Sequence, residues 1–147
     1  MKGYYKNPDA TSKVFDEEGW LHTGDMGTRS SDGTLFLRGR SKTMILSASG
    51  QNLYPEEIEA KLNNMPFVAE SLVVERDGKL VALVYPDFEA LDRFEVSLPD
   101  MDSTMENIRL ELNKLVAPYE RISKIVLMPN EFEKTPKRSI KRFLYSV

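Results

Sequence analysis

Two glycine-rich polar segments in the first third of the chain carry the residue types best suited to chemistry. One is Gly19–Gly27, and the other starts at Gly39 and runs to Asn52. Glycine at this density indicates backbone that takes positive φ or lets another molecule approach closely. Asp25 and Arg40 lie within these segments. A carboxylate can accept hydrogen bonds from both hydroxyls of a ribose, and a planar guanidinium can donate two hydrogen bonds to a phosphate. The pair therefore indicates a nucleotide-like ligand.

Each of these residues also has a purely structural explanation. Asp25 could be a turn aspartate that bonds its own backbone, and Arg40 could form a surface ion pair worth about 0–1 kcal/mol. The glycine loop of residues 47–52 suits an anion or a thin chain, although its spacing is not that of a phosphate-binding P-loop. His22 is the only imidazole, and a lone histidine is more often structural than catalytic.

Composition narrows the class of protein. The chain has 147 residues, 41% of them hydrophobic and 29% charged, which is typical of a soluble domain with one core and perhaps an appendage. A net charge of −3 disfavours a nucleic-acid binder. Without cysteine and with a single histidine, a protein-built zinc site is not expected. The lack of a signal-like or membrane-spanning apolar run predicts a cytoplasmic location.

The C-terminal tail concentrates positive charge. Its basic residues are Lys134, Lys137, Arg138, Lys141 and Arg142. Such a run is either a solvated face or a surface that docks on an anionic membrane, in which case the protein would be membrane-peripheral.

A β-hairpin is the first regular structure that the sequence predicts around these residues. Residues 3–18 show no period and read as an extended lead-in. Asp32-Gly33 predicts a tight turn between strands around residues 28–29 and 34–37. Residues 44–46 predict a short buried strand.

The second half predicts two helices and three strands. Pro55 begins a helix whose buried face holds Ile58, Leu62 and Met65, with Pro66 as its stop. Asp77-Gly78 joins strands 68–75 and 79–85, and residues 80–85 are so apolar that both faces of that strand should be covered.

A capping-box pattern from Ser103 to Glu106 predicts the second helix, which should bury Ile108, Leu112 and Leu115 and end before Pro118. Residues 122–128 form the last strand. The predicted fold class is therefore α+β, with helices packed on a small mixed β-sheet and a hairpin-rich extension in front.

Several ordered motifs resemble one family over nearly the whole chain. They are GWLHTGD (19–25), GRSK (39–42) and SGQNLYPEEIE (49–59), preceded by GYYKNPDAT (3–11). Together they resemble the C-terminal portion of AMP-forming acyl-CoA synthetases, the superfamily that also includes luciferases and peptide-synthetase adenylation domains. The YPEEIE segment (54–59) and the KRFLY segment (141–145) are most similar to the corresponding segments of long-chain fatty-acid CoA ligases.

The resemblance implies roles for individual residues. Thr23 and Asp25 would contact the adenylate, with Asp25 holding its ribose and Arg40 touching the same ribose and a phosphate. Lys42 would be the hinge about which a small domain rotates. Gly50 would face the pantetheine channel of CoA. Asn52 stands where many relatives place an arginine near the α-phosphate.

The tail departs from the family pattern. The family has a catalytic lysine in a Thr-Pro-x-Gly-Lys motif, and here the lysine slot is Ser139. Serine cannot supply the positive charge that the developing phosphate needs. Lys137 or Lys141 would substitute, with Lys141 favoured, or adenylation would use residues outside this chain.

The resemblance also implies an organisation and a set of ligands. Residues 1–40 would end a large N-terminal adenylation domain, and 41–147 would be the small mobile C-terminal domain. ATP or AMP, CoA, a fatty acid and Mg²⁺ would bind, with the metal held mainly by the N-terminal domain of the same polypeptide. This chain alone would be catalytically silent. The alternatives are a ligase for aryl or other acids that uses CoA or an acyl-carrier protein, and a non-enzymatic module that binds anionic surfaces.

Overall fold

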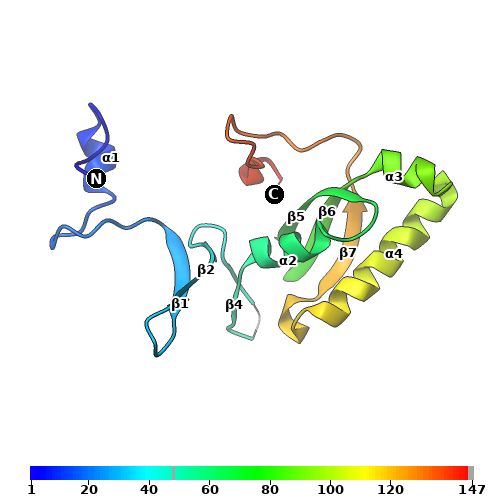
Figure 1. Ribbon diagram of the computed structural model, residues 1–147, viewed down its shortest axis with the longest axis horizontal. Helices are drawn as coiled ribbons and strands as arrows, with labels where there is room; N and C mark the ends of the chain where they lie inside the picture. Colours follow the sequence, from blue (N-terminus) through cyan, green and yellow to red (C-terminus); the bar gives the residue numbers. More distant parts are fainter. Residues whose placement is uncertain (48, 146–147) are drawn as a thin grey trace. The chain divides into compact units, whose positions relative to one another are not determined.

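A computed structural model of the chain describes residues 1–47 and 49–145 (Figure 1). The chain forms two compact units, Met1–Thr43 and Met44–Val147. The first unit contains helix α1 (Pro8–Ser12) and strands β1 (Asp25–Arg29) and β2 (Leu35–Arg40). The prediction of an extended lead-in is therefore wrong at α1. The Asn7 side chain caps this short helix by accepting a 3.0 Å hydrogen bond from the Ala10 N–H, and Pro8 suits its first position.

Strands β1 and β2 pair antiparallel, and this confirms the predicted hairpin. A bulge follows Met26, so that Asp25 lies opposite Arg40 while Gly27 lies opposite Leu37. A Cβ on Gly27 would lie 2.9 Å from the Phe36 carbonyl oxygen, so only glycine fits without a backbone shift.

The second unit is built on a mixed three-stranded sheet of order β5-β6-β7. Strand β5 (Val68–Arg76) pairs antiparallel with β6 (Lys79–Pro86), which pairs parallel with β7 (Ile122–Leu127). All three strands of this sheet confirm the sequence predictions. A separate pair joins β3 (Ile45–Leu46) to β4 (Asn52–Leu53), a strand that was not predicted. The prediction that residues 44–46 are buried is wrong for Leu46, which is 64% exposed.

Two helices have boundaries that differ from the prediction. Helix α2 (Pro55–Leu62) begins at Pro55 as predicted and ends before Met65 and Pro66. Helix α4 (Leu98–Leu115) begins well before the predicted cap. The Ser103 hydroxyl donates to the Asp100 carbonyl within this helix, at 2.8 Å, so the capping-box interpretation is wrong.

The remaining elements complete the second unit. Helix α3 (Phe88–Arg93) was not predicted, and two short 3₁₀ helices span Pro118–Glu120 (η1) and Arg142–Leu144 (η2). Helix α4 ends before Pro118 as predicted, but Leu115 lies exposed rather than buried.

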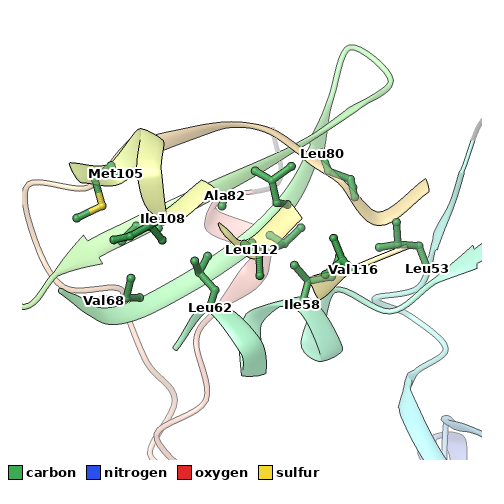
Figure 2. Packing of buried hydrophobic residues seen from close by; sticks show 13 residues of the cluster. Leu53, Ile58, Leu62, Val68, Leu80, Ala82, Met105, Ile108, Leu112 and Val116 are labelled. Carbon is green, nitrogen blue, oxygen red and sulfur yellow. The ribbon is translucent and has the colours of Figure 1, made fainter. Parts of the chain in front are cut away.

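One face of the sheet is covered by α2 and α4. Buried side chains from α2, α4 and β6 pack together there (Figure 2): Ile58, Leu62, Met105, Ile108, Leu112, Leu80, Ala82 and Val84. This confirms helices packed on one face of a small mixed sheet. Burial of this apolar surface is the main source of stability for the unit.

The other face of the sheet is covered by the C-terminal tail. Buried Val81 and Leu83 of β6 pack with Phe132, while Ile140 and Tyr145 lie against the same cluster. Strand β6 is therefore buried on both faces, as its apolar sequence predicted. The tail is not simply a solvated charged run, because its apolar residues cover the sheet.

Candidate functional site

The predicted ribose-binding residues meet at the open end of the β1–β2 hairpin. Arg40 and Asp25 form an ion pair, in which Nη1 of Arg40 donates to Oδ1 of Asp25. The same Nη1 donates to the Thr23 carbonyl oxygen at 3.3 Å, and the Asp25 N–H donates to the Thr23 hydroxyl at 3.2 Å. Gly24 has φ +75°, a conformation that glycine adopts without strain and that turns the chain between Thr23 and Asp25.

The Asp25 carboxylate is held in its charged form. The hydrogen bond from Arg40 lowers the pKa of Asp25 below its ordinary value, and the Thr23 hydroxyl lowers it further. Asp25 is therefore ionised at neutral pH. Since a carboxylate has about four acceptor sites over two oxygens, the contact with Arg40 leaves capacity for the two hydroxyls of a sugar.

A cavity of about 550 Å³ adjoins this pair within the first unit. Its lining includes Thr23, Arg40 and Lys42 together with Lys13 and His22. Three cationic side chains around one cavity favour an anionic ligand such as a phosphate ester. Lys13 was missed from the sequence because it directly follows α1 and lies just beyond the GYYKNPDAT segment, so no motif includes it.

His22 serves the loop in which it lies. Its ring Nε2 lies 3.1 Å from Oδ2 of Asp16, and its backbone N–H donates to the Val14 carbonyl at 2.7 Å. The other carboxylate oxygen of Asp16 accepts from the Trp20 N–H, and this backbone bond is the main reason the pKa of Asp16 is lowered. His22 also lines the cavity, and these contacts support the structural interpretation over the catalytic one.

Lys42 follows β2 in a short turn. The Thr43 N–H donates to the Arg40 carbonyl at 3.2 Å, and the two compact units divide directly after Thr43. This is a suitable position for a hinge, and the hinge role itself stays a prediction.

The predicted CoA-facing loop is the turn between β3 and β4. The Gly50 N–H donates to the Ser47 carbonyl and the Gln51 N–H to the Ser47 hydroxyl, both at 2.9 Å. The turn itself uses these two N–H groups, so they are not available to an anion, and the alternative of a thin chain that passes close to Gly50 stays a prediction. Gly50 has φ +77° with open space where a Cβ would stand, and Asn52 is exposed on β4. Ala48 lies outside the described residues.

The tail forms a well-defined turn around Ser139, the residue at the family's lysine position. The Thr135 N–H donates to the Ser139 carbonyl at 2.8 Å, and Lys134 and Ile140 form an antiparallel bridge. We call residues 134–140 the tail hairpin. Arg138 fills the family's glycine slot at φ +60°, a value that favours glycine.

The candidate cations in and beside the tail hairpin differ in their surroundings. Lys137 is exposed at its tip. Lys141 directly follows the hairpin, and its Nζ lies 2.7 Å from Oε2 of Glu133. Ser139 donates its N–H to the Thr135 hydroxyl at 3.3 Å. The geometry keeps both lysines as candidates for the missing charge.

The structure brings together only part of the predicted set. Thr23, Asp25, Arg40 and Lys42 meet in the first unit. Gly50 and Asn52 lie on the β3–β4 hairpin of the second unit, and Lys137 and Lys141 belong to its tail.

Comparisons with known proteins agree on one superfamily. No protein-family model matches the chain. A 4-coumarate–CoA ligase of Narcissus pseudonarcissus is 33% identical over 142 residues, covering 97% of this chain and 24% of that protein. A long-chain-fatty-acid–CoA ligase of Mycobacterium tuberculosis is 30% identical over an alignment of 163 residues, covering 97% of this chain and 27% of that protein.

Solved structures agree with these relatives. The adenylation domain of a carboxylate reductase from Mycobacterium chelonae superposes with a TM-score of 0.85 at 26% identity, over 97% of this chain and 24% of that one. ATP-bound MatB from Rhodopseudomonas palustris gives a TM-score of 0.70 at 25% identity, over 97% of this chain and 27% of that one.

The fold is that of the α+β C-terminal domain of adenylate-forming enzymes. The homologues and structural neighbours of the chain are adenylate-forming acyl-CoA ligases and adenylation domains. The chain spans about a quarter of the length of these proteins. Among the helices of the described residues, none is long and apolar enough to cross a membrane.

Proposed function

We propose that this chain is the C-terminal part of an ATP-dependent, AMP-forming acid–CoA ligase. The observation that carries the proposal is the Asp25–Arg40 pair at the end of the β1–β2 hairpin, beside a cavity with a cationic lining. An ionised carboxylate suits the ribose hydroxyls, and the guanidinium suits the ribose and phosphate oxygens of an adenylate.

The proposed reaction has two half-reactions. In the first, the acid's carboxylate attacks the α-phosphate of ATP and pyrophosphate leaves. Asp25 and Arg40 hold the nucleotide. Lys137 or Lys141 of the tail supplies a positive charge that stabilises the negative charge developing on the phosphate. In the second, the small domain rotates about Lys42, and the CoA thiolate attacks the acyl-adenylate carbonyl beside the Gly50 turn, so that the thioester forms and AMP leaves.

Mg²⁺ would neutralise phosphate charge in the first half-reaction. Within residues 1–47 and 49–145 no group of acidic or histidine side chains is arranged to hold a metal. The proposal therefore assigns no residue of this chain to Mg²⁺, and it places that site in the N-terminal domain.

For the acid, we propose a long-chain fatty acid. The YPEEIE and KRFLY segments favour it, and one of the relatives is named a long-chain-fatty-acid–CoA ligase. An aryl acid is the main competitor because another relative is named a 4-coumarate–CoA ligase. A panel of fatty, aryl and short acids offered to the full-length enzyme would separate them. Comparable turnover with aryl acids would count against the fatty-acid assignment.

The proposal is tested on the full-length enzyme with Asp25→Ala. Hydrogen bonds to charged groups contribute about 1.5–3 kcal/mol each, so ATP affinity should fall about 10- to 100-fold. Asp32→Ala is the matched control, since Asp32 lies in the turn of the same hairpin and bonds only local partners in the described structure. Nucleotide binding by calorimetry is the readout, and equal effects of both variants would refute the proposed role of Asp25.

The isolated 147-residue chain should release no pyrophosphate from ATP and palmitate. Turnover by this chain alone would show that the first half-reaction needs no further domain, and it would contradict the proposed division of labour.

A further inference from the structure

A second ion pair, which the sequence did not predict, joins α2 to the end of the tail. Nη1 of Arg142 lies 2.8 and 2.9 Å from the two carboxylate oxygens of Glu59, and its Nη2 donates to the Val73 carbonyl at 3.0 Å. The Val73 N–H donates to Oε1 of Glu59 at 2.7 Å. We call Glu59, Arg142 and the Val73 backbone the edge clamp.

The edge clamp occupies the outer edge of the sheet. Strand β5 pairs with β6 on one side only, and within the described sheet the N–H and C=O of Val73 bond to Glu59 and Arg142 instead of to another strand. The clamp satisfies both groups with one carboxylate and one guanidinium. An unpaired strand edge is a liability that proteins cover, and here α2 and the tail cover it together.

The geometry of the edge clamp requires arginine. One guanidinium contacts both oxygens of Glu59 and a backbone carbonyl, which a lysine ammonium on a flexible stem cannot reproduce in a fixed plane. The side chains of Arg142 and Glu59 are only 22% and 12% exposed. Little solvent therefore competes for these bonds.

The tail hairpin lies between this clamp and a second anchor. Arg142 follows Lys141 directly, and at the other end Lys134 forms an ion pair with Glu70 of β5. Ile140 packs in the cluster on the same face of the sheet, and the Tyr145 hydroxyl accepts from the Glu133 N–H at 2.9 Å. The hairpin and Lys141 are thus fixed against β5 from both sides.

We propose that Glu59 and Arg142 are positioning residues for the adenylation half-reaction. They hold the tail hairpin, and with it Lys137 and Lys141, in one place relative to the sheet. The same pair ties the tail to α2, which begins just after the β3–β4 hairpin that carries Gly50. This inference rests on the proposed ligase function for its catalytic part and on the contacts alone for its structural part.

Hydrogen exchange on the 147-residue chain tests the structural part. Arg142→Ala should speed exchange of residues 131–145 and of the Val73 amide about a hundredfold, because it leaves Glu59 buried without its cation. If that variant does not fold, Glu59→Gln combined with Arg142→Gln avoids the unpaired charge and should still speed tail exchange about tenfold. Glu111→Gln is the matched control, since it removes an exposed pair with Lys114 on α4.

Separate assays of the two half-reactions in the full-length enzyme test the catalytic part. The double variant should slow pyrophosphate release about tenfold or more, while thioester formation from supplied acyl-adenylate changes less than about twofold. Arg142→Lys should lose less of the adenylation rate than the double variant does, but it should not reach the wild-type rate.

The outcomes separate the two ideas. Wild-type exchange in the double variant overturns the clamp whatever the activity. Faster tail exchange with equal losses in both half-reactions overturns the positioning role. Faster tail exchange in an enzyme whose wild type forms no adenylate supports the clamp and refutes the proposed function.

Discussion

The two arginine–carboxylate pairs of this chain have similar chemistry and opposite surroundings. Asp25 and Arg40 face solvent at the end of a two-stranded hairpin, with side chains 37% and 61% exposed. Glu59 is buried and Arg142 is half-buried at the edge of a three-stranded sheet, between a helix and the tail. An exposed pair contributes little to stability and remains accessible to a ligand. A buried pair fixes the position of the elements that carry it, and removing one partner is costly.

The largest expected effect is on the buried pair. Arg142→Ala should lower the free energy of unfolding of the 147-residue chain by about 3–5 kcal/mol, because an uncompensated carboxylate stays in the interior. Glu59→Gln should cost far less, since its amide still accepts from Val73 and no buried anion remains. Chemical denaturation measures both variants. Similar losses for the two would mean that loss of the charge pair itself, and not the unpaired carboxylate, sets the cost.

The apolar contacts of the two units should differ almost as much. Leu112→Ala should cost about 2–5 kcal/mol, because Leu112 is fully buried between α4 and the sheet. Leu37→Ala on β2 should stay within about 0.5 kcal/mol, since that side chain is 79% exposed. The measurement is the denaturant midpoint of each variant at constant slope. A large loss at Leu37 would show that it is covered in solution.

Short sequence patterns correctly predicted those helices, turns and strands that a few neighbouring residues specify. Pro55 marked the start of α2, and Asp77-Gly78 marked the turn between β5 and β6. The apolar run of β6 showed that both faces are covered. In each case the deciding residues lie within a few positions of the element, and tertiary contacts agree with them.

The start of α4 was misplaced for a physical reason. Ser103 and Glu106 have capping-box spacing, but Pro99 and Asp100 suit an earlier first turn. The Ser103 hydroxyl then bonds back to a carbonyl within the helix. The same residue types occur at a cap and in a helix interior, so the pattern alone did not decide.

In the candidate site too, residues within local motifs were predicted, and residues that only the tertiary structure brings together were missed. Asp25 and Arg40 were found because short glycine motifs flank them. The edge clamp was missed because Glu59 and Arg142 are 83 residues apart and belong to no shared motif. The tail looked like a charged run, since Phe132, Ile140 and Tyr145 are spaced without a period among its cations.

The pH dependence of stability should reflect the buried pair. Burial raises the pKa of Glu59 above its ordinary 4.5, although Arg142 acts in the opposite direction. A carboxyl whose folded pKa is raised contributes its full stability below the unfolded pKa and loses it as pH rises through the folded pKa. Wild type should therefore lose stability relative to Glu59→Gln between acid and neutral pH. Unfolding measured across that range checks this, and a constant difference would contradict the raised pKa.

The smallest expected effect is the titration of Asp25, which has the opposite sign. Arg40 lowers its pKa below the ordinary 3.8, so the favourable contribution of the pair is present above that value and fades as pH falls through the lowered pKa. Carboxyl NMR should show the pKa of Asp25 rising toward 3.8 in Arg40→Gln, and rising less in Thr23→Val because the hydroxyl is the lesser cause. Arg29→Gln, at the other end of β1, should leave it unchanged. If Arg40→Gln left the pKa of Asp25 in place, the two side chains would not be paired in solution, and the exposed site would lack the preformed charge arrangement that distinguishes it from an ordinary turn.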